Sequence, residues 1–247
     1  MKTSNDIIFG IHTVIEAIQS GKEIDKILIK KELRGDLIKE LHVALKGTII
    51  PVQRVPLERL NRITRKNHQG VVAFISAVTY NHLEDIIPFI FEKGKDPFIV
   101  LLDGLTDVRN FGAIARTCEC AGVDAIVIPS KDSVSVNADA MKTSAGALNI
   151  LPVCKEKSIN QAIRYLKNCG ITVFASSEKA VKNYMEVAFK GPIAIVMGAE
   201  DTGVSSENIK ICDEIIKIPQ FGTIGSLNVS VAASILIYES VRQRMNI

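Results

Sequence analysis

The 247-residue sequence predicts an α/β protein in which a small α/β domain precedes a larger parallel-sheet domain. Two observations lead to this fold class. From Pro97 onward, short runs of valine, isoleucine and leucine alternate with windows of helical periodicity, which is typical of a parallel sheet covered on both faces. The composition, 47% hydrophobic and 23% charged, excludes a disordered, collagenous or coiled-coil protein.

The first part, residues 1–76, has enough elements for a small α/β domain. Helical patterns cover 12–21, where Gly21 is a C-cap candidate, and 37–45. Strands are expected at 26–29, 48–52 and 71–78. Residues 77–96 have weaker turn signals and predict a connecting helix, so we place the linker there and the second domain at 97–247.

The second part alternates strands and helices. Strands are expected at 98–103, 124–129, 171–176, 191–198 and 213–219, and helices at 110–122, 135–148, 159–170 and 228–244. Ligands of such sheets bind beyond the carboxyl ends of the strands. We therefore expect a site at the loops after Asp103, Met197 and Ile218.

Charge is distributed unevenly along the chain. Residues 1–80 hold 13 Lys/Arg against 8 Asp/Glu, whereas the remaining residues hold 17 against 19. The basic side chains are densest in residues 52–70, where they are Arg54, Arg59, Arg62, Arg65 and Lys66. Such a cluster is suited to neutralising the phosphates of a polyanion by counterion release, and a solvated helix face is an equally good interpretation.

The five cysteines include no CxxC pair, and the four histidines are scattered singly. Neither a disulfide framework nor a metal site is expected. The N-terminus lacks the pattern of a signal peptide, and no apolar run approaches membrane-spanning length. We expect a cytoplasmic protein with no membrane partner.

The loop after Asp103 leads into a helix for which Asn110 is a candidate N-cap. The apolar positions of this helix share one face: Phe111, Ile114, Ala115, Cys118 and Gly122. Arg116 points away from that face, beside Gly112 and Ala113, whose small size leaves room for another chain or a ligand. A solvated arginine and a capping asparagine are the simpler interpretations.

The loop after Met197 joins an apolar strand to a helix through Gly198, Glu200, Asp201 and Gly203. Glycines after a strand allow the backbone to approach a ligand closely. No Lys-Ser/Thr follows Gly203, and Glu200 occupies the second glycine position of a GxGxxG pattern, so a phosphate loop and a dinucleotide fingerprint are disfavoured. A plain turn with carboxylates near a helix N-terminus is the alternative.

The loop after Ile218 precedes a long helix that Ser226 or Asn228 can cap. Capping alone requires neither the long glycine-rich loop at 220–227 nor the apolar Leu227 within it. An apolar side chain in a glycine-rich loop beside other strand ends is suited to a flat heteroaromatic ligand.

These three loops resemble, in order, the three motifs of the SpoU (TrmH-like) family of SPOUT RNA methyltransferases. The resemblance covers 97–247, and its most specific piece is IPQFGTIGSLNVSVAASILIYE. The chain as a whole resembles the RlmB type, which modifies a guanosine ribose 2′-hydroxyl in large-subunit ribosomal RNA. IFGIHTVIEAI and HQGVVA resemble, less specifically, the RNA-binding module of that type.

The resemblance implies a deep trefoil knot, S-adenosylmethionine as methyl donor, and usually a homodimer. Five residues fall on the positions that line the reaction centre: Asn110, Arg116, Glu200, Ser226 and Asn228. Four fall on the positions that bind the donor through backbone and apolar contacts: Met197, Gly198, Ile218 and Leu227. The family also implies a part for Arg116 in deprotonating the hydroxyl, although a guanidinium is a poor base at neutral pH.

The sequence departs from many relatives at Val108, where proline is common, and at Asn149, where an acidic residue is common. Two alternatives remain open at this point. The same chemistry on transfer RNA is one, and a non-catalytic RNA-binding assembly factor is the other, although the residues of the reaction centre are all present.

Overall fold

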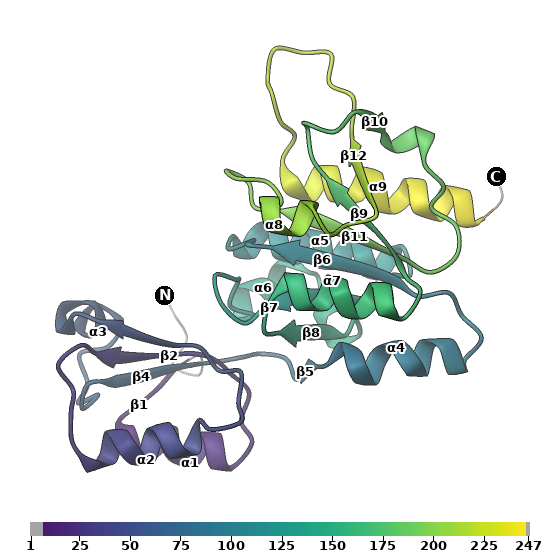
Figure 1. Cartoon of the computed structure of the whole chain (residues 1–247). Helices are drawn as coiled ribbons and strands as arrows, with labels where there is room; N and C mark the ends of the chain where they lie inside the picture. Colours follow the sequence, from purple (N-terminus) through teal and green to yellow (C-terminus); the bar gives the residue numbers. More distant parts are fainter. Residues whose placement is uncertain (1–6, 246–247) are drawn as a thin grey trace. The chain divides into compact units, whose positions relative to one another are not determined.

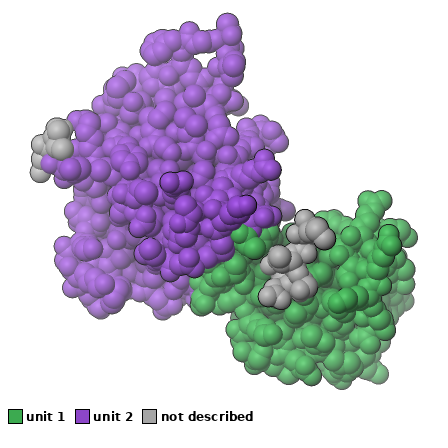
Figure 2. Space-filling model, turned by 180° about the vertical axis from the view of Figure 1, so that it is seen from behind, with its two compact units in different colours: residues 1–79, 135–138 green, residues 80–134, 139–247 purple. Residues whose placement is uncertain are grey.

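The computed structural model describes residues 7–245, which form two compact units. One unit comprises the chain up to Thr79 together with Ser135–Ala138, and the other comprises Tyr80–Val134 and the chain from Asp139 onward (Figure 2).

The first unit is a four-stranded sheet of order β1-β4-β2-β3, in which β2 and β3 are parallel and the other pairs antiparallel. Its elements are β1 Ile7–Phe9, α1 Ile11–Gln19, β2 Ile24–Lys30, α2 Asp36–Ala44, β3 Val52–Val55, α3 Leu57–Ile63 and β4 Val71–Ile75. Helices α1 and α2 bury one core with the sheet, and α3 buries a second, smaller one through Leu60.

The strand expected at 48–52 is wrong in position. The structure forms β3 four residues later, at Val52–Val55, where the first three residues are exposed. Ile50 instead packs from the preceding loop against the α1–α2 core. A polar edge strand lacks the apolar pattern on which the prediction relies, and the isoleucines before it supply a misleading one.

The second unit is an eight-stranded sheet of order β10-β12-β9-β11-β6-β7-β8-β5 in which every pair is parallel (Figure 1). Its strands are β5 Tyr80–Asn81, β6 Phe98–Asp103, β7 Ala125–Pro129, β8 Val153–Glu156, β9 Thr172–Ser176, β10 Lys182–Asn183, β11 Ile193–Gly198 and β12 Glu214–Lys217. Its helices are α4 Leu83–Glu92, α5 Val108–Cys120, α6 Ala138–Thr143, α7 Ile159–Asn168, α8 Ser206–Ile209 and α9 Val229–Arg244, with 3₁₀ turns at Ala147–Asn149 and Tyr184–Glu186. The predicted α/β class with a parallel sheet is confirmed.

Two expectations for this unit need correction. The helix expected at 135–148 is only the short α6, followed by the 3₁₀ turn. The sequence predicts no strand at β8, because the four residues of this strand include Lys155 and Glu156 and give no apolar run. The connecting helix expected between 77 and 96 is α4. The trefoil knot stays a prediction.

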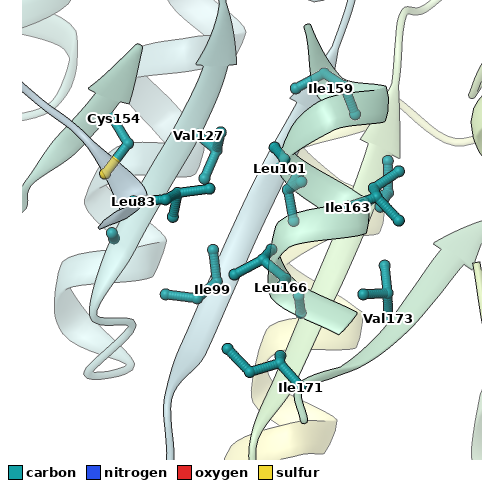
Figure 3. Close-up of a cluster of buried hydrophobic side chains, with 14 of the residues drawn as sticks. Leu83, Ile99, Leu101, Val127, Cys154, Ile159, Ile163, Leu166, Ile171 and Val173 are labelled. Carbon is teal, nitrogen blue, oxygen red and sulfur yellow. The ribbon is translucent and has the colours of Figure 1, made fainter. Parts of the chain in front are cut away.

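One core of this unit lies between the sheet and α7 (Figure 3). Ile159, Ile163 and Leu166 recur at helical spacing and pack on Ile99 and Leu101, which alternate along β6 and so share one face. Burial of each such side chain contributes about 1.5–3 kcal/mol. Helix α9 packs on α5 and contacts β11, and Figure 1 shows α5 and α9 behind the sheet, away from α7.

The strand order positions the candidate site. Strand β11 lies between β9 and β6, and β12 pairs with β9 on its other side. Because all four strands are parallel, the loops that follow them meet at one edge of the sheet. Within residues 7–245, no helix is long and apolar enough to cross a bilayer.

Candidate active site

A cavity of about 330 Å³ lies at the carboxyl ends of β9, β11 and β12. Its walls come from residues 176–179 and 197–203 and from seven residues after β12, which are Ile218, Gln220, Gly225, Ser226, Leu227, Val229 and Ala232. All four residues expected to bind the donor line it, namely Met197, Gly198, Ile218 and Leu227, together with Glu200 and Ser226. The structure thus brings two of the three predicted loops into one cavity.

The loop after β11 folds back over its own strand. The amide of Gly203 donates to the carbonyl of Ala199 (2.9 Å), and Gly203 has a positive φ of 66°. A Cβ on Gly198 would lie 1.9 Å from the carbonyl carbon of Gly203 and 2.1 Å from the nitrogen of Val204. Gly198 is therefore required by the close approach of these two backbone segments.

Asp103, at the end of β6, fixes the far end of the same loop. Its Oδ2 accepts hydrogen bonds from the amide of Ser205 (2.8 Å) and from Nδ2 of the buried Asn208 (2.9 Å). The thiol of Cys212 donates to the carbonyl of Asn208 (3.2 Å), and burial raises the pKa of this thiol to about 12, so that it keeps its proton. The sequence reasoning missed this anchor.

Helix α5 begins two residues before the predicted start, and Asp107 rather than Asn110 is its N-cap. One oxygen of Asp107 accepts from the amides of Arg109 (2.7 Å) and Asn110 (2.9 Å). The prediction that Asn110 caps the helix is wrong, because the carboxylate of Asp107 already accepts the hydrogen bonds of the free amides in the first turn. The side chain of Asn110 is consequently available for other contacts.

Three of the five predicted reaction-centre residues form one hydrogen-bonded chain. Nδ2 of Asn110 donates to Oε1 of Glu200, and Nδ2 of Asn228 donates to Oδ1 of Asn110 (3.1 Å). Of the two predicted cap candidates, Asn228 and not Ser226 is the N-cap of α9, and it accepts from the amide (2.9 Å) and hydroxyl (2.6 Å) of Ser230. The chain connects α5, the cavity loop and α9. Glu200 and Asn228 are exposed and Asn110 is half-buried, so an incoming substrate can reach all three.

Arg116 is exposed on α5, as expected, and its side chain makes no hydrogen bond or ion pair within residues 7–245. It forms no hydrogen bond or ion pair with Glu200, whose hydrogen-bond partner is Asn110. The expected space beside Gly112 is absent, because a Cβ there would lie 2.6 Å from Cβ of Thr143. Gly112 serves close packing of α5 against the end of α6, not a ligand.

The loop after β9 is a wall that the sequence reasoning missed. Ser176, Ser177, Glu178 and Lys179 line the cavity, whereas residues 104–110 do not. The signal is present in the sequence, since 171–176 is predicted as a strand of the same parallel sheet. A parallel strand ends at the same sheet edge as β11 and β12, and the strand order then places it between them.

The five basic residues singled out in the sequence lie in the first unit and are all exposed or half-exposed. Arg54 is on β3 and donates to the carbonyl of Lys31 (3.0 Å). Arg59 and Arg62 lie three residues apart on α3, on one side of the helix. Arg65 and Lys66 follow in the next loop, and Nζ of Lys66 lies 5.8 Å from the ring centre of Phe9. None of the five lines the cavity.

Parallel α/β proteins bind small ligands in cavities at the carboxyl ends of their strands, and this unit has such a cavity. Asn110 connects the cavity to a helix that bears an exposed arginine. Comparison with known families narrows this class. Residues 97–238 match the model of the SpoU rRNA methylase family, and residues 7–81 match the model described as RNA 2′-O ribose methyltransferase substrate binding. The chain belongs to the SpoU (TrmH) family of RNA methyltransferases.

Two relatives named as TrmH family methyltransferases are similar in sequence to this chain along nearly its whole length. A protein of Staphylococcus haemolyticus named as a TrmH family tRNA/rRNA methyltransferase is 37% identical over 238 residues, covering 96% of both chains. The TrmH family tRNA/rRNA methyltransferase YacO of Bacillus subtilis is 33% identical and covers 99% of this chain and 98% of its own.

Solved structures share the fold. The SpoU methyltransferase AviRb of Streptomyces viridochromogenes, solved with AdoMet, has a TM-score of 0.61 at 22% identity, covering 97% of this chain and 90% of its own. The A. aeolicus TrmH/SpoU tRNA modifying enzyme has a TM-score of 0.56 at 33% identity, covering 62% of this chain and 77% of its own.

The close approach at Gly198 gives a prediction about stability. Gly198→Ala should reduce the free energy of unfolding by more than about 3 kcal/mol, because the added methyl group meets backbone that cannot move without unfolding the turn. Gly225→Ala is the matched control in the same cavity, since its Cβ would meet nothing within 4 Å. Urea denaturation of both variants measures the difference, and equal stability would show that the turn yields easily.

Proposed function

We propose that the protein transfers a methyl group from S-adenosylmethionine to the ribose 2′-hydroxyl of a guanosine in large-subunit ribosomal RNA, as a cytoplasmic homodimer. The observation that carries the proposal is that two of the three sequence motifs line one cavity, and that hydrogen bonds of Asn110 to Glu200 and Asn228 connect them to the helix bearing Arg116. The match to the SpoU rRNA methylase family supports the ribosomal substrate.

The cavity residues fit the methyl donor. Met197, Ile218, Leu227 and Val229 supply apolar surface for a flat heteroaromatic ring. Glycines at 198, 203 and 225 present backbone groups for hydrogen bonds instead of side chains. When bound, S-adenosylmethionine supplies a methyl group on a positively charged sulfur.

The residues at the cavity edge then act on the RNA. Transfer to oxygen requires the 2′-hydroxyl in line with the methyl carbon, so orientation is the first demand. Arg116 is exposed and has no hydrogen-bond or ion-pair partner within the described residues, so its guanidinium binds the adjacent phosphate or the oxygen as negative charge develops there. Glu200, held by Asn110, and Ser226 orient the ribose at the mouth of the cavity.

The first unit supplies affinity for RNA. Its match to the substrate-binding model and its exposed basic side chains support this role. The exposed apolar residues Val231 and Tyr238 on α9 support a homodimer formed through this helix.

Methylation of defined RNAs tests the proposal. The purified protein should transfer labelled methyl from S-adenosylmethionine to one guanosine ribose of unmodified large-subunit ribosomal RNA and leave transfer RNA unlabelled. Label on transfer RNA alone would keep the chemistry and overturn the substrate, an outcome consistent with the names of relatives and with the A. aeolicus neighbour. Donor binding without label on either RNA would indicate a non-catalytic assembly factor.

The proposed role of Arg116 predicts a separation of turnover from donor binding. Arg116→Ala should lower turnover at least about 100-fold, the loss typical of removing a group that stabilises developing charge. The dissociation constant of the donor, measured by calorimetry, should stay unchanged because Arg116 does not line the cavity. Arg164→Ala, an exposed arginine on α7, is the control and should keep full turnover. Normal turnover in Arg116→Ala would refute the assignment.

The basic residues of α3 predict a change in the salt dependence of RNA binding. The double variant Arg59→Gln/Arg62→Gln should weaken binding and reduce the slope of log K against log salt by roughly 1.5, since each phosphate contact contributes about 0.7–0.9. Lys39→Gln is a matched control, because Asp36 already neutralises this lysine (2.8 Å). Filter binding across salt concentrations measures the slope, and an unchanged slope would indicate that this face of α3 is merely solvated.

A further inference from the structure

The connection between β12 and α9 carries apolar side chains that nothing in its own unit covers. Phe221 is 98% exposed and Ile224 is 79% exposed. From Ile218 to Asn228 the sequence contains no charged residue. Figure 1 shows this connection extending beyond the edge of the sheet.

The base of this loop is closed while its tip stays open. With its amide nitrogen facing the loop, Gln220 donates to the carbonyls of Gly225 (2.8 Å) and Ile224 (3.2 Å). Gln220, Gly225 and Ser226 line the cavity, whereas Phe221 does not. Phe221 therefore lies in the exposed part of a closed loop, directly after the residue that closes it, and the base of this loop forms a wall of the cavity.

Burial in the fold does not explain why an aromatic residue occupies position 221. A side chain that is almost fully exposed gains no burial energy, and a Cβ on the neighbouring Gly222 would meet nothing within 4 Å. Because the loop is uncharged, a phosphate is not its natural partner either. An exposed aromatic ring beside the reaction centre of an RNA enzyme is suited to stacking on an unpaired base.

We propose that Phe221 is a stacking platform for an unpaired nucleobase of the substrate RNA, at or next to the nucleotide that is methylated. This inference rests on the proposed function. A ribose that enters the edge of a protein cavity must leave the regular helical stack, and its base or its neighbour then loses a stacking partner. Phe221 replaces that partner, and it contributes affinity that does not depend on counterion release.

Tryptophan fluorescence tests the contact directly. The chain contains no tryptophan, so Phe221→Trp creates a single reporter on the loop. Its emission should be quenched when unmodified large-subunit ribosomal RNA is added. Phe89→Trp is the matched control, since Phe89 is 53% exposed on α4, outside the cavity, and its emission should not change.

Kinetics test whether the aromatic ring itself matters. Phe221→Leu keeps apolar bulk without a π face and should raise KM for RNA about tenfold. Phe221→Tyr should retain the wild-type KM. In both variants the donor dissociation constant and the salt slope of RNA binding should match the wild type, because neither the cavity nor a charge is changed.

The outcomes separate the two proposals. If wild-type protein methylates the RNA but the emission of the Phe221→Trp variant is unchanged and Phe221→Leu has a normal KM, stacking is refuted and the proposed function stands. If wild-type protein methylates no RNA, the proposed function fails. A blue shift in the emission of the Phe221→Trp variant with protein concentration alone, without RNA, would show that a second copy of the chain covers this loop, and would also overturn stacking.

Discussion

The site depends on the contact between two backbone segments at Gly198. Residues 203 and 204 pass so close to the end of β11 that no side chain fits between them. This approach turns the loop through Glu200 back over the sheet edge, and Asp103 holds its far end by two hydrogen bonds. The cavity is thus formed mainly by backbone position, which apolar packing of β11 between β9 and β6 keeps rigid.

A fixed loop then permits the contacts between side chains from distant parts of the sequence. Asn110 and Asn228 are 118 positions apart, and Asn110 and Glu200 are 90 apart. The backbone that carries each side chain is fixed by a separate local interaction. Asp107 caps α5, Asn228 caps α9, and the turn at Gly198 positions Glu200. Because these hydrogen bonds lie near solvent, each contributes only about 0.5–1.5 kcal/mol to stability. The main effect of these hydrogen bonds is to orient the side chains of Asn110, Glu200 and Asn228.

The sequence was sufficient for the parallel sheet and for most strands of the second unit, because buried parallel strands are continuous apolar runs. It failed where a strand is short and polar, as at β3 and β8, since there the neighbouring strand and not the local pattern decides the structure. For the site, the motif positions found the two cavity walls that follow β11 and β12, but not the wall that follows β9. They did not show that Asp107 caps α5 or that Asp103 anchors the loop, because both facts depend on which amide each carboxylate meets in three dimensions.

The distribution of charge and exposure indicates how the two units divide their work. The basic excess lies in the first 80 residues, while the remainder is slightly acidic and carries the cavity. Under the proposed function, long-range attraction for RNA comes from the first unit, whereas Arg116 and Phe221 of the second unit act at short range. An enzyme built this way can bind a polyanion strongly without placing many positive charges beside a cationic sulfur centre, whose binding such charges would oppose. Electrostatic affinity and methyl transfer are then separable properties of a single chain.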